Sequence, residues 1–234
     1  MRKITLFFCL ILISISFYGC AKSVGKVVND SLSEVRYNLY QVYTNEIDIQ
    51  FTSGFREEPY IINGISESKK EFGIITAHFL FDIKDFSGLP TFNIKINERE
   101  FEGEFEQNPF DQSFVYDIEI FVLDDAKISI EINWGNFDFS SGLDNISNNF
   151  QCDYKQALKI FIEEFKPDIK KIIVNNKLQG EVYVKLISRP ELKTNKVYWY
   201  VSLAGKSGQT MSVVIDPYSK QVLAKNLSSN SLYV

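Results

Sequence analysis

The chain has 234 residues, which suits one domain or two, and its composition excludes several kinds of protein. Hydrophobic residues make up 45% of it and aromatic residues 15%, so it can bury a real core and is not disordered as a whole. The formal net charge of −5 disfavours a phosphate-binding surface, and we therefore expect no nucleic-acid partner. The same acidic balance disfavours polybasic attachment to a membrane.

The first twenty residues have the pattern of an export signal. Arg2 and Lys3 precede a mostly apolar run at 4–18, and Gly19 stands directly before Cys20. A run of this length is too short to span a hydrocarbon core of roughly 30 Å, but it suits a signal peptide. The stretch resembles a bacterial lipoprotein signal, which implies cleavage after residue 19 and a diacylglycerol anchor on Cys20. An ordinary secretory signal is the alternative.

The resemblance implies a lipid-anchored protein at the extracytoplasmic face of the cell membrane, with membrane contact through the Cys20 lipid alone. Because Cys9 leaves with the signal at 1–19, Cys152 is the one thiol that remains, and no disulfide is available in the mature chain. We expect Cys152 to be a quiet, partly buried residue. Residues 20–32 are mostly small and polar, and we expect them to form a flexible tether.

From 33 to 137 apolar and polar side chains alternate. The clearest segments are 75–83, 92–96, 101–105, 114–120 and 128–132. Such alternation is typical of half-buried antiparallel strands. About seven short strands in about 100 residues predict an antiparallel β-sandwich, immunoglobulin-like in type, with a β-barrel as the alternative.

The pattern changes after residue 137. Residues 138–151 are rich in Gly, Ser, Asn and Asp and are predicted to be a linker. Apolar residues over 154–165 then recur at helical spacing, with Asp153 as the N-cap and Pro167 as the expected end of the helix. Strand-like runs follow at 182–187, 197–201, 210–215 and 221–224. We expect a small α+β domain over 152–226, a helix on an antiparallel sheet, and a polar tail at 227–234.

The C-terminal hairpin at 214–223 carries a family resemblance. Its strand, its Asp216, its turn with Ser219 and the following Val222-Leu223 are similar to the PepSY family, as is Ala157-Leu158 on the helix. The resemblance covers 152–226. It implies regulation or inhibition of an extracellular peptidase, and it transfers no catalytic residues.

The residues that usually carry catalysis are scarce. His78 is the single histidine, and neither a nucleophile nor an acidic partner for it is recognisable in the sequence. With one histidine and one free cysteine, a tetrahedral zinc site would need carboxylates for its remaining ligands. We therefore expect no metal, no cofactor and no catalytic residues, so the chain is not predicted to be an enzyme.

Four glutamates form the first candidate surface. Glu100, Glu102, Glu104 and Glu106 alternate with other residues, which predicts that all four lie on one face of one strand. A neighbouring strand would place Asn93 and Lys95 near them. The face is a candidate for a cation or a partner, and a third hypothesis makes its carboxylates those of a hydrolase. The simpler interpretation is a solvated face that prevents edge-to-edge pairing.

Aromatic residues form the second candidate surface. Trp199 must point away from its neighbours Tyr198 and Tyr200, and Phe110 and Phe114 lie in the 108–114 loop, so we take Trp199, Phe110 and Phe114 as candidate partner contacts. The leading hypothesis is a non-catalytic binding protein anchored by its lipid, whose partner is a cell-envelope component. An extracellular peptidase is the alternative partner.

Overall fold

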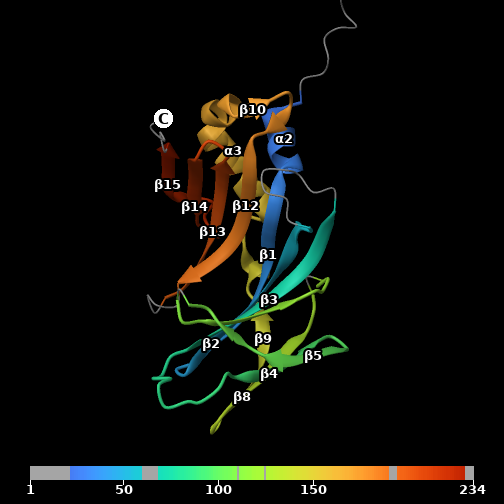
Figure 1. The fold of residues 1–234 in the computed structure, drawn as a ribbon, viewed down its shortest axis with the longest axis vertical. Coiled ribbons are helices and arrows are strands. Elements are labelled where there is room, and N and C mark those ends of the chain that lie inside the picture. Colours follow the sequence, from blue (N-terminus) through green and yellow to red (C-terminus); the bar gives the residue numbers. More distant parts are fainter. Residues whose placement is uncertain (1–21, 60–67, 110, 124, 190–193, 230–234) are drawn as a thin grey trace, which may run out of the picture.

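The computed structural model describes residues 22–59, 68–109, 111–123, 125–189 and 194–229 and confirms the predicted α+β class. Most of these residues lie in strands, and two α-helices accompany them (Figure 1). The helices are α2 (Val24–Asp30) and α3 (Tyr154–Lys171), and a short 3₁₀ turn, η1 (Ser147–Asn149), precedes α3. Within the described ranges, no helix is both long enough and apolar enough to cross a bilayer.

The strands follow one another closely along the chain. In order they are β1 (Leu32–Tyr43), β2 (Ile47–Glu57), β3 (Lys69–Phe79), β4 (Thr91–Ile96), β5 (Arg99–Glu104), β6 (Glu106–Gln107), β7 (Phe114–Ile118), β8 (Ile128–Trp134), β9 (Phe137–Asn145), β10 (Ile173–Val174), β11 (Lys177–Leu178), β12 (Gly180–Arg189), β13 (Thr194–Gly205), β14 (Gln209–Ile215) and β15 (Val222–Ser229).

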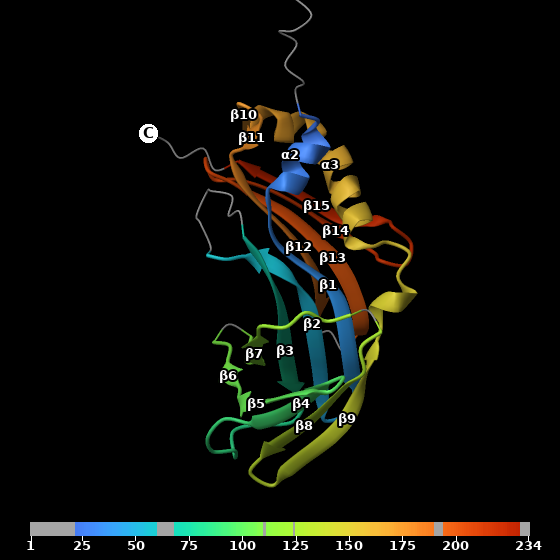
Figure 2. The same ribbon diagram turned by 90° about the vertical axis from the view of Figure 1, so that its right-hand side faces the viewer.

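Most of the strands belong to one long, bent sheet. Its main path runs β15-β14-β13-β12-β1-β2-β3-β7-β6. Strands β4, β5, β8 and β9 form a second layer, which joins the path where Tyr40 of β1 pairs with Asn145 of β9. This layer faces β1, β2 and β3 across a common core (Figure 2). The sheet is nearly closed at this end of the molecule, which fits the predicted sandwich or barrel.

Strand β1 runs through both halves of the structure. Near its start, Val35 pairs in parallel with Val184 of β12 and antiparallel with Phe55 of β2. Further along, Tyr40 pairs with Phe51. Neighbours across a ladder share a face of the sheet. The same face is therefore covered by helices near Val35 and by the second layer near Tyr40.

Two cores result. The helix-covered core includes Val27, Val28, Val35, Ala157, Phe161, Phe165, Val184, Trp199, Val201 and Val213. The barrel core includes Tyr40, Ile49, Phe51, Ile75, Ile94, Phe105, Phe114, Ile130, Ile132 and Trp134. A bulge in β1 between Arg36 and Asn38 separates the two regions, and Gly54 lies opposite it. A Cβ at Gly54 would lie 1.8 Å from the carbonyl oxygen of Val35, so only glycine fits there.

Helix α3 begins where the sequence predicts. The Asp153 carboxylate accepts a hydrogen bond from the Gln156 amide at 2.7 Å, which satisfies one of the free N–H groups of the first turn. The predicted end is wrong, because the helix continues through Pro167 to Lys171. Ile169 lies beyond the proline and is fully buried in the helix-covered core. Burial of that side chain offsets the backbone hydrogen bond that proline removes.

The predicted tether is also wrong for the described residues. Val24, Val27 and Val28 lie at helical spacing, and they give α2 an apolar face that packs into the helix-covered core. The hydroxyl of Ser23 caps this helix by accepting from the Lys26 amide at 3.2 Å. The valines, rather than the polar residues between them, decide the structure of the segment.

The predicted linker and tail are structured as well. Residues 137–145 form β9, in which Phe139 pairs with Ile132 and Leu143 with Ile128. The polar residues of this stretch occupy the solvent-facing positions between them. Strand β15 extends to Ser229, three residues into the predicted tail.

Candidate functional site

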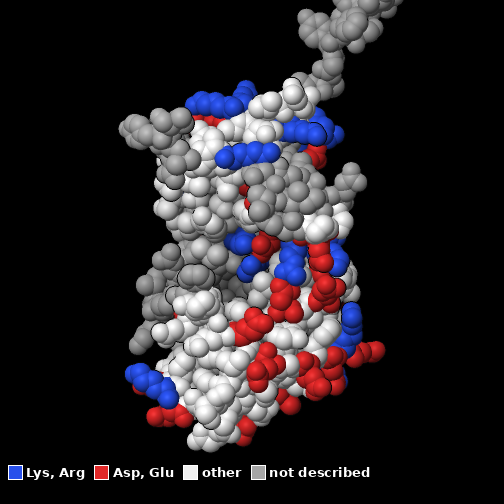
Figure 3. All heavy atoms as spheres, viewed as in Figure 1, with Lys and Arg blue, Asp and Glu red and all other residues white. Residues whose placement is uncertain are grey.

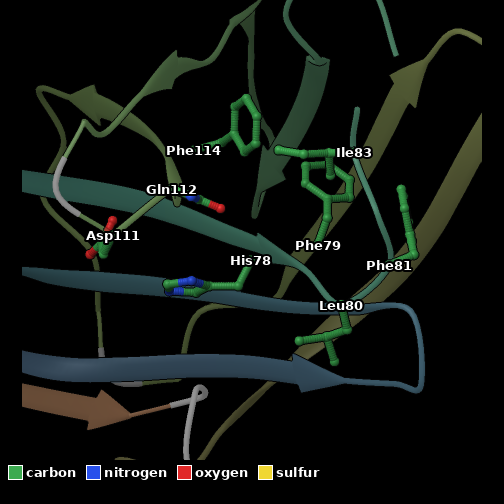
Figure 4. A pocket seen from close by; sticks show the side chains of 8 residues that line it. All are labelled: His78, Phe79, Leu80, Phe81, Ile83, Asp111, Gln112 and Phe114. Atoms are coloured by element: carbon green, nitrogen blue, oxygen red, sulfur yellow. The ribbon is translucent and has the colours of Figure 1, made fainter. Parts of the chain in front are cut away.

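The main concave feature follows the outer face of β1, β3 and β7 and continues past the end of β3, where the rings of Phe79 and Phe114 at the edge of the barrel core line it. Two hollows adjoin there because both are lined by Asp111, and we call them together the β3–β7 groove. The larger has a volume of about 620 Å³ and the smaller about 210 Å³. Figure 4 shows the smaller hollow, with His78, Asp111 and Gln112 beside the rings of Phe79 and Phe114.

Strand β3 supplies the floor of the groove. Its side chains alternate, so Ile75 and Ala77 enter the barrel core while Ile74, Thr76 and His78 point to the outer face. The ladder places Thr76 between Gln50 of β2 and Val115 of β7. Both neighbouring ladders are antiparallel and regular here, so the floor is rigid.

A buried polar network lies beside His78. Asp48 is opposite His78 in the β2–β3 ladder and is only 2% exposed. Its carboxylate accepts hydrogen bonds from the amides of Gln41 and Gln50 at 2.7 and 2.8 Å, and the Gln50 amide also donates to the Ser188 hydroxyl at 2.5 Å. Burial raises the pKa of Asp48, although these two hydrogen bonds act to lower it.

Described residues of the 108–113 loop, Asn108, Asp111, Gln112 and Ser113, form one wall. Asp111 accepts hydrogen bonds from the backbone amide and the hydroxyl of Ser113, at 3.0 and 2.6 Å. The Asn108 amide donates to the Ser113 carbonyl at 2.7 Å, and Gln112 has a φ of 60°. Together these bonds close a tight turn. The loop therefore holds the Asp111 carboxylate at the junction of the two hollows.

Charged residues form the opposite end of the groove. Arg56 makes a two-pronged ion pair with Asp117, and its guanidinium lies 4.7 Å from the centre of the Phe72 ring. Arg36 bonds Glu34 at 2.5 Å, and Lys185 bonds the other oxygen of that carboxylate at 2.9 Å. Each of these carboxylates is thus neutralised by a neighbouring base.

The pKa values of the two carboxylates beside the groove, Glu34 and Asp48, shift in opposite directions. Burial pushes the pKa of Glu34 upward, but the charges of Arg36 and Lys185 outweigh that effect, and the net shift is downward. Burial lowers the pKa of Lys185, and repulsion from Arg36 acts in the same direction. Asp48 has amide partners instead of cations, so its pKa shifts the opposite way.

This arrangement suits binding by hydrogen bonds. The groove offers hydroxyls from Thr76 and Ser113, an amide from Asn108, the Asp111 carboxylate and the Arg36 guanidinium. In the described part of the chain, no hydroxyl or thiol is hydrogen bonded to the His78 imidazole. Among the same residues, no group of three or more His, Cys, Asp or Glu side chains lies close enough to hold a metal ion.

The acidic residues predicted from sequence are only partly together. Glu100, Glu102 and Glu104 lie on the exposed face of β5, and Glu100 pairs with Lys95 at 3.1 Å. Glu106 is not on that strand, because Phe105 turns into the barrel core and Glu106 begins β6. The prediction of four glutamates on one strand is therefore wrong for Glu106, which instead lines the groove.

Two of the predicted aromatic contacts are core residues. Trp199 is 1% exposed, and its indole N–H donates to the Cys152 carbonyl at 2.7 Å. Phe114 is 2% exposed and packs edge-on against Phe79 and Trp134. Both predictions are wrong, because helix α3 and the second layer cover the faces that the sequence left open. Phe110 and Cys20 lie outside the described residues.

Cys152 is more deeply buried than the sequence predicts. It is fully buried, and burial with the nearby Asp153 charge raises the pKa of its thiol to about 11. The groove residues Arg36, Thr76 and Ser113, and Asp48 buried beside the groove, were not predicted. Their only sequence signal is a polar residue at every second strand position, which identifies a face but not what lies beside it.

Comparisons with known protein families, with curated proteins and with solved structures found no match to this chain. The fold and the groove therefore carry the functional argument by themselves.

Proposed function

We propose that the protein is a lipid-anchored, extracytoplasmic binding protein whose ligand site is the β3–β7 groove. The observation that carries the proposal is the groove itself, a hollow of about 620 Å³ on rigid strands, lined by hydroxyl, amide and carboxylate groups. Of its charged members, Arg36 and Asp117 are already paired within the protein, whereas Glu106 and Asp111 leave the lining with an excess of negative charge. A ligand with many hydrogen-bonding groups and no excess negative charge near its contacts fits such a lining.

The anchor and the location come from the sequence. The run at 4–18 followed by Gly19-Cys20 resembles a lipoprotein signal, and the proposal places the diacylglycerol on Cys20. At the extracytoplasmic face, cell-envelope polymers and their fragments are available as ligands, and they are polar and rich in hydroxyl and amide groups. Soluble peptidoglycan fragments are therefore the first probe.

Thr76 offers a direct test, because its side chain lies on the groove floor. We expect isothermal titration calorimetry to show binding of soluble peptidoglycan fragments to the wild-type chain and none to Thr76→Trp, whose indole fills the hollow. Thr210→Trp is the matched control, since Thr210 is an exposed strand residue on β14. Equal binding by the wild type and Thr76→Trp, or no binding by the wild type, contradicts the proposal.

A second candidate function is regulation of an extracellular peptidase by the PepSY-like segment 152–226. Two observations favour it. The Asp216 carboxylate accepts from the amides of Tyr218 and Ser219 at 2.8 Å, which builds the turn that carries the resemblance. The edge strand β15 that follows exposes Leu223 and Leu227, which suits strand addition by a protein partner.

The structure determines which form of the protein has to be used to test this candidate function. Segment 152–226 shares its core with Val27, Val28 and Val35, so the complete chain has to be used. We expect the chain to slow a thermolysin-type metallopeptidase, and Leu223→Asp with Leu227→Asp to abolish the effect. Unchanged peptidase activity at high micromolar protein contradicts this candidate.

The proposal also includes the immunoglobulin-like type that the sequence predicts for the sandwich. We infer that the nearly closed end is related to an immunoglobulin-like sandwich, on the strength of its two facing layers and alternating strands. Sharing of β1 with the helix-covered half is the feature that departs from such a sandwich.

A further inference from the structure

Charge is divided between the two ends of the molecule. Segments 22–30 and 150–180, which contain the helices, carry eight lysines against five acidic residues. Residues 91–145, at the other end, carry thirteen acidic residues against three basic ones. Figure 3 shows basic side chains gathered at the helical end and acidic ones over the opposite half. The net charge of −5 for the whole chain does not reveal this separation of basic and acidic residues.

A groove lies between the two helices at the basic end. It has a volume of about 610 Å³, and we call it the α2–α3 groove. Val24, Leu158 and Ile162 provide its apolar lining, and all three pack against the helix-covered core. Val174 is 50% exposed on the β10–β11 hairpin. This hairpin lies at the same end of the molecule as the two helices (Figure 2).

Lysines from one face of α3 surround this lining. Lys155, Lys159, Lys166 and Lys170 recur at helical spacing and are all exposed. Lys159 is 3.9 Å from Glu163. In the described part of the chain, Lys155, Lys166 and Lys170 form no ion pair, so their charges are available to an anionic surface.

The first described residues lie at the same groove. Lys22 and Ser23 line it, and Cys20 is only two residues before Lys22. Two residues span at most about 7 Å. Because α2 replaces the predicted tether, a lipid on Cys20 would hold this end of the molecule against the bilayer rather than at a distance.

We propose that the α2–α3 groove docks on the anionic phospholipid surface of the membrane that carries the anchor. The inference rests on the proposed anchor at Cys20 for its orientation. Apolar side chains among lysines suit the boundary between headgroups and acyl chains. The acidic end then points away from the membrane, beyond the roughly 8 Å over which charges are felt at physiological salt. The average acidity of the chain is thus compatible with electrostatic docking.

Vesicle sedimentation tests the docking. The protein is the chain from residue 20 with Cys20→Ser, which keeps every described residue and removes both the apolar leader and the acyl chain. We expect it to bind vesicles of phosphatidylcholine with 30% phosphatidylglycerol (a chosen composition, on the order of natural anionic content), and to lose binding in high salt. Vesicles of phosphatidylcholine alone should bind far less.

Three lysines decide whether the groove is responsible. Replacing Lys155, Lys166 and Lys170 with Gln should lower the vesicle partition coefficient on the order of a hundredfold, since each lysine near an anionic surface contributes roughly fivefold. The matched control removes the same charge at the other end, with Lys84→Gln, Lys95→Gln and Lys127→Gln, and should bind as well as the parent.

Several outcomes overturn the proposal. Equal binding to neutral and anionic vesicles, or equal loss in both triple variants, shows that the groove lysines do not dock the protein. Loss of self-association instead of vesicle binding in the groove variant assigns the groove to a second copy of the chain. Fatty-acid labelling of Cys20 is independent of these readouts, so failure of docking and failure of the anchor are distinguishable.

Discussion

Val35 of β1 pairs in parallel with Val184 of β12, and this pairing ties the first strand of the chain to the sheet that follows α3. The same strand carries Tyr40 into the barrel core. A strand shared in this way gives neither half a complete core of its own. We therefore expect the two cores to unfold together.

The two tryptophans of the chain report on the cores separately. Trp134 lies in the barrel core and Trp199 in the helix-covered core. Trp199→Phe removes the hydrogen bond to the Cys152 carbonyl and leaves that oxygen unpaired, so we expect a loss of about 1–3 kcal/mol in the free energy of unfolding. Urea unfolding followed by Trp134 fluorescence should show the whole of this loss, although Trp134 lies in the other core. An unchanged Trp134 transition, with far-UV circular dichroism showing two steps, contradicts the coupling.

Asp48 makes stability depend on pH. Its folded pKa is raised above the ordinary value of 3.8, so the protonated form is favoured in the fold. Its contribution to stability is therefore present below pH 3.8 and is lost as the pH rises through the folded pKa. Asp48→Asn should be as stable as the wild type or up to about 1 kcal/mol more stable at pH 7, and this difference should disappear near pH 3.5.

Asp48→Ala is the control for this prediction. It leaves the Gln41 amide and one N–H of the Gln50 amide without their acceptor and should cost about 1–3 kcal/mol at every pH. An Asp48→Asn variant that is less stable than the wild type at pH 7 by the same amount would show that the ionised carboxylate stabilises the fold.

The contribution of Glu34 to stability is expected to have the opposite pH dependence. Its folded pKa lies below the ordinary value of 4.5, so its contribution is present above pH 4.5 and is lost as the pH falls through the depressed folded value. Glu34→Gln should lower the free energy of unfolding at pH 7 by about 1–3 kcal/mol, because Arg36 and Lys185 lose their shared partner. The exposed pair at Glu100 is the control, and Glu100→Gln should change stability by about 0.5 kcal/mol or less. Equal effects of the two substitutions at pH 7 would contradict the account.

Pro167 lies inside α3 and is predicted to reduce stability. Pro167→Ala restores a backbone N–H within the helix, which gains more than the loss of proline rigidity in the unfolded chain costs. We expect the free energy of unfolding to rise by about 1–2 kcal/mol in urea titrations. Lys166→Ala, at the neighbouring exposed position, should change it little. A less stable Pro167→Ala variant would show that the proline fits a distortion that the helix needs.

The sequence predicts strands and the start of α3 well, because each has a simple periodic signal. The alternating segments 75–79 and 128–132 lie in strands β3 and β8, and Asp153 caps helix α3 as predicted. The same reasoning fails where a short segment gains its structure from distant contacts. Helix α2 has only three valines to mark it, and its stability comes from packing against α3.

The groove could not be predicted from the sequence, because it too depends on contacts between distant segments. Thr76 and His78 lie on the polar face of β3, and alternation predicts that face correctly. What converts the face into a groove is the 108–113 loop and the register that places β7 beside β3. Register and loop position arise from the whole sheet, and no local pattern encodes them.

The lipid on Cys20 is the part of the proposed function on which the location of the protein and its orientation both depend. Metabolic labelling in a bacterial host with an alkyne-bearing fatty acid tests it most directly. The account predicts a labelled wild-type chain and an unlabelled Cys20→Ser chain. A wild-type chain without label, or equal label on the Cys20→Ser chain, would contradict it.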